Sequence, residues 1–376
     1  MNDSIERYIE RLLNESTPET PIWNIERVRS GQPPHWNYID GCMLIALWEL
    51  YSKSGDTKYA DFCLNFMDFY IGEDGIPLGY DMEAYNVDFI CPGRVLFDLY
   101  KYSRREKFKR AIDVLYTQIE RQPRTYEGSF WHKAIYTNQV WLDGLFMAQV
   151  FYVRYALEYN KPEFLDDTLR QFNTAQERMY DRKTGLYRHG YDASKAAFWA
   201  DKETGQSRSV WLRSLGWFSL ALCDIVSYLP DGRHKDTLIK ILVELLDRVG
   251  RYADPETGMY WQVVDQPGRE GNYLESSGSS MIARAMLKSH RLGLVSDETR
   301  RLGLKTFKGV CDKYLSERDG SLNLGGICLL AGLGPENNRR RDGSYEYYIS
   351  EPVVENDAKG VAPFLMCYVE AKLCGF

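Results

Sequence analysis

Asp143 is the residue of this chain whose type and setting point most directly to chemistry. It lies within the run Val140-Trp141-Leu142-Asp143-Gly144-Leu145-Phe146-Met147, in which nearly every other residue is apolar. A lone charge in such surroundings costs several kcal/mol, so the carboxyl group either finds a partner or keeps its proton. A carboxylic acid that keeps its proton near neutral pH can act as a general acid. The alternative is a structural carboxylate that accepts hydrogen bonds from a helix N-terminus.

Two further aspartates are candidates for the same chemistry. Asp88 begins another apolar run, and we expect it to face Asp143. Two carboxylates that lie close together share one proton, which favours a neutral acid. The alternative role of Asp88 is the N-cap of a helix. Asp40, in Tyr38-Ile39-Asp40-Gly41, has the same local setting as Asp143 and is a weaker candidate.

A cation and two histidines complete the set of polar candidates. Arg213 lies between Trp211 and Trp217. A guanidinium held among aromatic rings suits a substrate carboxylate or, equally well, an internal ion pair with an aspartate. His132 and His189 are expected to donate to sugar hydroxyls or to that carboxylate, although a lone loop histidine is as often an ordinary satisfied polar residue.

The tryptophans gather where these candidates lie. Seven of the nine occur in loops or at the starts of predicted apolar helices: Trp36, Trp131, Trp141, Trp199, Trp211, Trp217 and Trp261. Such a concentration favours an aromatic cup that stacks on a flat, weakly polar ligand such as a sugar ring. The alternative is that these side chains only plug one end of the fold.

The elements that must position these residues are helices. Apolar periodicity and the Gly, Pro and Asp breakers predict twelve of them. They cover residues 3–14, 38–54, 57–70, 87–102, 105–120, 138–159, 161–179, 209–228, 234–250, 274–292, 296–315 and 355–373. Loops with Thr-Gly followed by large residues, such as 181–189 and 254–262, predict a turn and a short strand.

Alternate helices share a pattern. Apolar helices with a glycine near their start (Gly41, Gly93, Gly144, Gly216, Gly278 and Gly360) alternate with amphipathic helices that carry charged faces. Six such pairs predict an (α/α)6 barrel, an all-α toroid with an inner and an outer ring, formed as one domain over residues 1–376. An open α-solenoid is the alternative. In the closed form, the loops that precede the inner helices converge on one mouth.

Composition limits the partners. The net charge is −6 and no long basic run occurs, which argues against nucleic acid. No stretch of 18 apolar residues indicates a membrane span, and the N-terminal residues do not resemble a secretion signal. The eight cysteines form no Cys-x-x-Cys pair and are expected to be reduced thiols. We therefore expect a cytoplasmic monomer or homodimer.

At the candidate aspartates, histidines, arginine and tryptophans, the chain resembles glycoside hydrolase family 105, the unsaturated rhamnogalacturonyl hydrolases. It resembles more distantly the unsaturated glucuronyl hydrolases of family 88. The most specific matches are Val140–Gly144, the segment from Gly185-Leu186-Tyr187-Arg188-His189 to Trp211-Leu212-Arg213-Ser214-Leu215-Gly216-Trp217, and the tail from Arg341 to Val361. The family usually has a small residue after the position of Trp211 and Gly-Asn before that of Gly216. The bulkier Leu212, Ser214 and Leu215 are expected to narrow or redirect the aglycone side.

The resemblance implies both the fold and the site. It implies an (α/α)6 barrel, Asp143 as the acid/base, Asp88 as its partner, and sugar contacts from His132, Trp141, His189, Trp211, Arg213 and Trp217. The substrate is then an oligosaccharide with a terminal 4-deoxy-4,5-unsaturated uronic acid, most simply an unsaturated rhamnogalacturonan disaccharide. Such chemistry needs no metal and no organic cofactor.

Other functions remain open at this point. On the same fold, the chain could be an inverting glycosidase with two carboxylates flanking a glycosidic bond. A sugar epimerase is a further reading, and so is an unsaturated glucuronyl hydrolase acting on ulvan or glycosaminoglycan fragments. From a different class, a helical-repeat scaffold could grip a peptide in its aromatic mouth.

Overall fold

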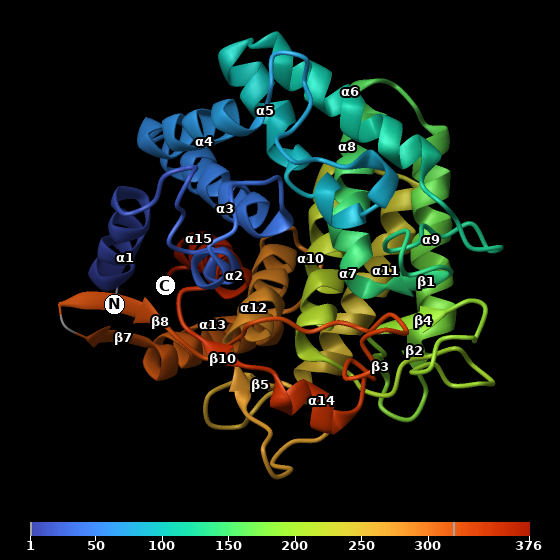
Figure 1. The fold of residues 1–376 in the computed structure, drawn as a ribbon. Coiled ribbons are helices and arrows are strands. Elements are labelled where there is room, and N and C mark those ends of the chain that lie inside the picture. Colours follow the sequence, from blue (N-terminus) through green and yellow to red (C-terminus); the bar gives the residue numbers. More distant parts are fainter. Residues whose placement is uncertain (1, 319) are drawn as a thin grey trace.

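Six helices form a closed inner ring (Figure 1). The computed structural model describes residues 2–318 and 320–376. Each inner helix contacts the next one around the ring, and the last contacts the first, although these two lie at opposite ends of the sequence. The (α/α)6 barrel is therefore confirmed, and the open solenoid is excluded. The inner helices are α3 (Tyr38–Ser54), α5 (Gly93–Ser103), α8 (Val150–Glu158), α10 (Leu212–Tyr228), α12 (Ser276–Arg291) and α15 (Ala358–Leu373).

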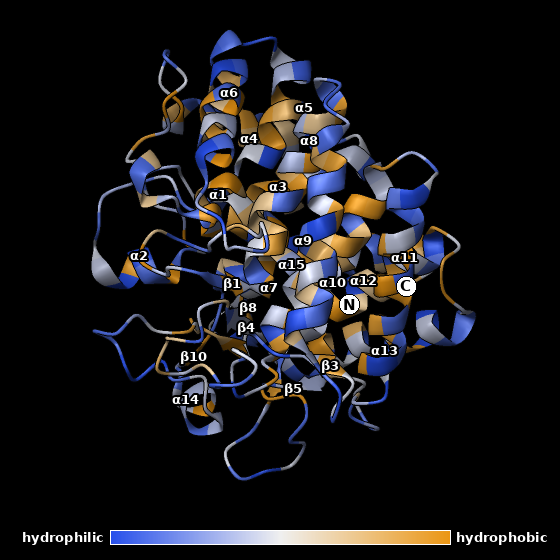
Figure 2. Cartoon of the chain, turned by 90° about the vertical axis from the view of Figure 1, so that its right-hand side faces the viewer, coloured by the Kyte–Doolittle hydropathy of each residue, from blue (hydrophilic) through white to orange (hydrophobic). Residues whose placement is uncertain are grey.

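Amphipathic helices surround this ring, and their exposed faces are the more hydrophilic ones (Figure 2). The N-terminal helix contacts the C-terminal helix. The hydroxyl of Tyr368 donates a hydrogen bond to the carboxylate of Glu6 at 2.7 Å. This bond fixes the place at which the two ends of the chain meet. The outer helices are α1 (Asn2–Asn14), α4 (Thr57–Tyr70), α6 (Glu106–Arg121), α9 (Glu163–Met179), α11 (Arg233–Gly250) and α13 (Asp297–Tyr314).

The repeated glycines allow the inner helices to approach closely. A Cβ atom built on Gly278 would lie 2.4 Å from Cγ of Leu212, and one on Gly216 would lie 2.6 Å from the sulfur of Met281. Neither contact is possible for a real side chain, so any larger residue would push α10 and α12 apart. At these two positions the glycines of the sequence pattern mark a close contact between inner helices.

Short pairs of strands lie in the segments between the helices of the barrel. Two of them fit the predicted turn-and-strand loops: β2 (Tyr180–Asp181) pairs with β3 (Leu186–Tyr187), and β5 (Tyr260–Trp261) pairs with β6 (Leu274–Glu275). All pairs in the described chain are antiparallel and two-stranded. The others join β1 (Gln139–Trp141) to β4 (Gly190–Asp192), β7 (Leu315–Arg318) to β8 (Ser321–Leu324), and β9 (Ile327–Cys328) to β10 (Val353–Val354).

One predicted helix is divided in the structure. Instead of a helix over 138–159, the chain forms β1, the short helix α7 (Leu142–Gly144), a π-helical turn over Leu145–Gln149, and then α8. The first residues leave the helix because they pair with β4, with Val140 opposite Tyr191. This division places Asp143 at the start of a helix, directly after a strand.

The helix predicted over 87–102 also begins later than expected. Residues Val87–Ile90 form a 3-10 turn, and α5 starts at Gly93, after Pro92. Two helices were not predicted, α2 (Ile25–Ser30) and α14 (Tyr345–Ser350). Both have six residues, too few to show a helical period, and both are capped by a side chain, that of Asn24 or Ser344.

Two findings concern the cysteines and the hydropathy of the helices. All eight cysteines are free, as predicted. Within residues 2–318 and 320–376, no helix is both long enough and apolar enough to cross a membrane.

Candidate active site

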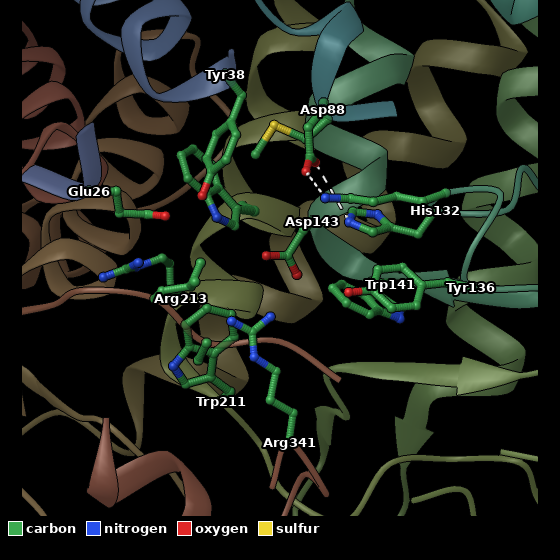
Figure 3. A pocket seen from close by; sticks show the side chains of 15 residues that line it. Glu26, Tyr38, Asp88, His132, Tyr136, Trp141, Asp143, Trp211, Arg213 and Arg341 are labelled. Carbon is green, nitrogen blue, oxygen red and sulfur yellow. Dashed lines mark ion pairs between the residues drawn. The ribbon is translucent and has the colours of Figure 1, made fainter. Parts of the chain in front are cut away.

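Most of the candidate residues surround one cavity of about 220 Å³ (Figure 3). Its walls come largely from the N-terminal ends of inner helices, because Tyr38 is the first residue of α3 and Arg213 the second of α10. The loops before these helices do converge, as predicted. The lining residues are Glu26, Tyr38, Asp88, His132, Lys133, Tyr136, Trp141, Asp143, Met147, Trp211, Arg213, Trp217, Leu330, Ala331 and Arg341.

Asp143 has a free carboxylate oxygen. The residue is 9% exposed, and its Oδ2 atom accepts no hydrogen bond from the described chain. Nε2 of His189 lies 3.1 Å from Oδ2, although the two atoms are not aligned as donor and acceptor. No backbone N–H of the described helix start donates to this side chain, so the purely structural alternative lacks its defining contact.

His189 lies behind the cavity wall. It is completely buried and is not among the lining residues, because its ring packs between Trp141 and Trp211. Its Nδ1 atom is 2.6 Å from the hydroxyl of Tyr348. Burial raises the pKa of Tyr348 well above its usual value, so the phenol stays protonated and can donate to Nδ1. The other ring nitrogen, Nε2, faces Asp143.

Asp88 is an ion-paired carboxylate and does not share a proton with Asp143. Its Oδ2 atom lies 2.8 Å from Nζ of Lys133, and its Oδ1 lies 3.6 Å from Nε2 of His132. Burial raises the pKa of Asp88, but the charge and the hydrogen bond of the Lys133 ammonium outweigh it, and the pKa is lowered. In the described chain no hydrogen bond joins the two aspartates, and the N-cap of this turn is Asn86. Asp88 therefore lines the cavity as an anion.

His132 faces the cavity as a neutral ring. It stacks on Trp141 with 4.2 Å between the ring centroids and 18° between the planes. Burial lowers its pKa to about 4, despite the opposing charge of Asp88. A Cβ on Gly144 would lie 3.2 Å from Nδ1 of His132, so the glycine leaves room for this ring against α7. At neutral pH, His132 can offer a hydrogen bond and no charge.

The guanidinium of Arg213 binds partners inside the protein, which was one of its two predicted roles. Its Nε atom donates to the hydroxyl of Ser277 at 2.8 Å, and Nη2 donates to the carbonyl of Cys328. Nη2 also lies 3.5 Å from a carboxylate oxygen of Glu275, so the ion-pair partner is a glutamate and not an aspartate. The residue is 1% exposed, yet it borders the cavity. Binding of a substrate carboxylate by Arg213 stays a prediction.

The aromatic cup is narrower than the sequence suggested. Trp141, Trp211 and Trp217 line the cavity. Of the other four, Trp36 is buried and donates to the carbonyl of Phe89, and Trp131, Trp199 and Trp261 are not lining residues. Some of the seven tryptophans therefore contribute to packing and not to the cavity, which agrees with the alternative interpretation.

The unusual residues near Trp211 do not narrow the cavity. Leu212 packs against Gly278 of α12, and Ser214 donates to the backbone carbonyl of Trp211. Leu215 is completely buried. None of the three lines the cavity. An effect of these residues on the aglycone side stays a prediction.

Several residues that line the cavity were not predicted from the sequence. Lys133 follows His132 directly, and that adjacency was the available signal. Arg341 ends the run Arg339-Arg340-Arg341, which looked like a solvated turn. Glu26 pairs with Lys359 at 2.6 Å and reaches the cavity from α2, a helix that the sequence did not reveal. Long-range contacts of this kind leave no local pattern.

A closed ring of helices that holds a free carboxylate oxygen among tryptophan side chains is the arrangement of a carbohydrate-cleaving enzyme. Comparison with known proteins agrees. Residues 8–373 match the sequence model of Glycosyl Hydrolase Family 88, and the chain therefore belongs to that family and is a glycoside hydrolase.

Individual relatives are similar over most of their length. A solved family 105 glycoside hydrolase from C. acetobutylicum ATCC 824 is 38% identical, with 97% of this chain and 99% of that chain covered and a TM-score of 0.88. This confirms the resemblance to family 105. Protein Atu3128 of Agrobacterium fabrum is 36% identical over 60% of this chain and 99% of its own. The unsaturated rhamnogalacturonyl hydrolase YesR of Bacillus subtilis is 25% identical over 68% of this chain and 72% of its own.

Proposed function

We propose that this enzyme removes a terminal 4-deoxy-4,5-unsaturated uronic acid from lyase-generated oligosaccharides, with Asp143 as the acid and then the base. The observation that carries the proposal is the carboxyl group of Asp143, which lines a cavity with room for a sugar ring and whose buried Oδ2 atom accepts no hydrogen bond from the described chain. A buried polar atom without a partner is costly, and a ligand that supplies the partner removes that cost.

The reaction begins at the double bond and not at the anomeric carbon. Asp143 gives its proton to C4, and the positive charge that results is shared between C5 and the ring oxygen. Water adds at C5, and the Asp143 carboxylate takes the proton that this water loses. The hemiketal formed at C5 then opens and expels the leaving sugar. One residue thus serves as acid and base, with no net change in its own protonation.

The surrounding residues divide the remaining tasks. The Nε2 atom of His189 faces Asp143 and can stabilise its carboxylate form after the proton has left. Asp88 stays ionised beside Lys133 and places a negative charge on the wall of the cavity in which the oxocarbenium charge develops. Trp141, Trp211 and Trp217 provide apolar faces for the sugar ring.

The substrate class that we propose is the unsaturated rhamnogalacturonan disaccharide. Its support is the name of the Bacillus subtilis relative, an unsaturated rhamnogalacturonyl hydrolase. An unsaturated glucuronyl hydrolase specific for heparin is 16% identical with a TM-score of 0.66, which is a likeness of fold alone.

The test is loss of the ultraviolet absorbance of the conjugated uronate when the enzyme is mixed with lyase-digested rhamnogalacturonan. We expect the absorbance to fall and free rhamnose ends to appear in equal amount. The matched control is the same disaccharide with a saturated uronate, which the mechanism leaves intact. Cleavage of the saturated compound at a similar rate would contradict the proposal and favour an inverting glycosidase. No absorbance loss on pectin, ulvan or glycosaminoglycan digests would contradict every unsaturated uronide as substrate.

A pair of aspartate variants tests the residue. Asp143→Asn should lower kcat by at least about 1000-fold while the protein stays folded, because an amide cannot donate the proton. Asp40→Asn is the control, since Asp40 has the same local sequence but accepts hydrogen bonds from Trp23 and Asn37. This control should lower the melting temperature and leave kcat within about twofold. Residual activity of a few per cent in Asp143→Asn would contradict the assignment.

A further inference from the structure

The charged residues that line the cavity are almost all neutralised by the protein itself. Glu26 pairs with Lys359, Asp88 pairs with Lys133, and Arg213 pairs with Glu275. Two charged lining residues are left. One is Asp143, to which the proposed function assigns the proton transfer. The other is Arg341, whose guanidinium makes no ion pair and no side-chain hydrogen bond within residues 2–318 and 320–376.

Arg341 differs in this respect from its two neighbours in the sequence. Arg339 pairs with Glu336 on the surface, and Arg340 pairs with Glu351 at 2.7 Å. Both are exposed, whereas Arg341 is half-buried and reaches the cavity. The run that looked like a solvated turn therefore contributes one side chain to the site. Figure 3 shows this guanidinium directed toward the centre of the cavity, on the side of Trp211.

The loop that carries Arg341 is fixed on both sides of the side chain. The N–H of Gly334 donates to the carbonyl of Arg341 at 2.8 Å, and the N–H of Gly332 donates to the hydroxyl of Tyr347 at 2.9 Å. Leu333 is completely buried in a cluster with Trp141. Because the backbone is held, the loop keeps Arg341 beside the cavity before any ligand arrives, and binding has to order only its side chain.

Gly332 lies close to both Trp141 and Arg341. A Cβ built on Gly332 would lie 3.3 Å from the ring of Trp141 and 3.6 Å from Nη1 of Arg341. A side chain longer than Cβ at this position would crowd both residues. A cation placed next to an aromatic wall suits a ligand that is both a sugar and an anion.

We propose that Arg341 is a specificity-determining residue that binds a carboxylate of the substrate. The proposal rests on the proposed function for the identity of that substrate, an unsaturated uronide. Such a sugar carries a carboxylate on C5, next to the carbon that Asp143 protonates. A guanidinium without an internal partner can form two parallel hydrogen bonds with this group. A uronate in the aglycone offers the same chemistry, and the substrates below distinguish the two sources.

The test compares Arg341→Gln with wild-type enzyme on three substrates. They are the unsaturated uronyl disaccharide with a neutral aglycone, its methyl ester at the uronate carboxyl group, and an unsaturated di-uronide. We expect KM on the neutral-aglycone disaccharide to rise at least about tenfold and kcat to change less than about threefold, since a charge-assisted hydrogen-bonded pair is lost. On the methyl ester, the variant and the wild type should have the same KM.

The other outcomes are equally informative. A KM increase confined to the di-uronide would support carboxylate binding and place the carboxylate in the aglycone. An unchanged KM on all three substrates would overturn the proposal. Arg341→Lys should reverse part of the KM increase, because lysine keeps the positive charge but cannot form two parallel hydrogen bonds as the planar guanidinium does. Added salt should raise the wild-type KM and leave that of Arg341→Gln nearly constant.

The matched control is Arg339→Gln, which removes a charge from the same arginine run but breaks only a surface ion pair. It should leave KM and the melting temperature unchanged. Titration calorimetry of the disaccharide into Asp143→Asn protein, with and without Arg341→Gln, measures binding without turnover. If wild-type enzyme turns over no unsaturated uronide, the proposed function fails. Calorimetry then still decides whether Arg341 binds the uronate, because equal affinities in the two proteins would contradict it.

Discussion

The phenol of Tyr348 lies 2.6 Å from Nδ1 of His189, across 159 positions of sequence. The opposite nitrogen of the same imidazole lies 3.1 Å from the carboxylate of Asp143. A hydroxyl that donates to Nδ1 leaves the ring proton on Nε2, and thereby decides what Asp143 faces. The small helix α14 therefore acts on the proposed acid through a histidine that does not border the cavity.

Tyr348→Phe should lower kcat about tenfold with little change in KM, because loss of a supporting hydrogen bond misorients the group that contacts Asp143. The free energy of unfolding should fall by about 1–2 kcal/mol, since Nδ1 is left buried without a partner. Steady-state kinetics and urea unfolding measure the two effects. The control is Tyr345→Phe in the same helix, whose hydroxyl donates to backbone carbonyls of residues 269 and 270. A kcat within twofold of wild type in Tyr348→Phe would show that the tyrosine is not needed for positioning.

His132 makes the stability of the protein depend on pH. Its pKa is about 4 in the folded state and about 6.5 in the unfolded chain. Between these two pH values the unfolded state therefore binds more protons than the folded state. The contribution of neutral His132 to the free energy of unfolding is thus fully present above about pH 6.5 and is lost as the pH falls toward 4. Between about pH 7.5 and 4.5 this residue should account for a loss of roughly 2–3 kcal/mol.

Urea unfolding of wild type and His132→Gln at both pH values measures this contribution. The variant lacks the titrating ring, so its loss on acidification should be smaller by that amount. Equal losses in the two proteins would mean that His132 is not held neutral in the folded state.

Lys133 is expected to keep Asp88 ionised. Lys133→Met removes the charge 2.8 Å from Asp88, and the pKa of Asp88 should rise as a result. If ionised Asp88 supports the reaction, the acid limb of the kcat/KM profile shifts upward by about one pH unit or more. Lys133→Arg keeps the charge and should restore the wild-type limb. An acid limb that does not move in Lys133→Met would exclude Asp88 as the group that sets it.

Arg213 should matter for stability whatever it does for binding. Arg213→Met leaves Glu275 as a fully buried carboxylate without its cation, and the free energy of unfolding should fall by about 3–5 kcal/mol. Arg208→Met is the control, because Arg208 forms a surface ion pair with Asp342, and its loss should cost less than about 1 kcal/mol. A small effect of Arg213→Met on unfolding, with a raised KM, would instead assign the guanidinium to the substrate carboxylate.

The sequence by itself determined the fold and the position of the proposed acid along the chain. Apolar helices alternating with amphipathic ones leave few arrangements that bury six apolar stripes, and Gly216 and Gly278 mark a close contact between inner helices. Asp143 was found because a carboxylate among apolar residues is costly and needs a reason. These are local properties, so a single sequence shows them.

Tertiary structure decided which aspartate is free. Asp40 and Asp143 have nearly the same neighbours in sequence, but Trp23, Asn24 and Asn37 donate to Asp40. Asp143 retains an oxygen that accepts no hydrogen bond from any residue that the structure describes. The same applies to the arginine run, in which two members pair on the surface and Arg341 enters the cavity. The charge state and availability of a side chain depend on partners brought in from distant segments, and local sequence carries no record of them.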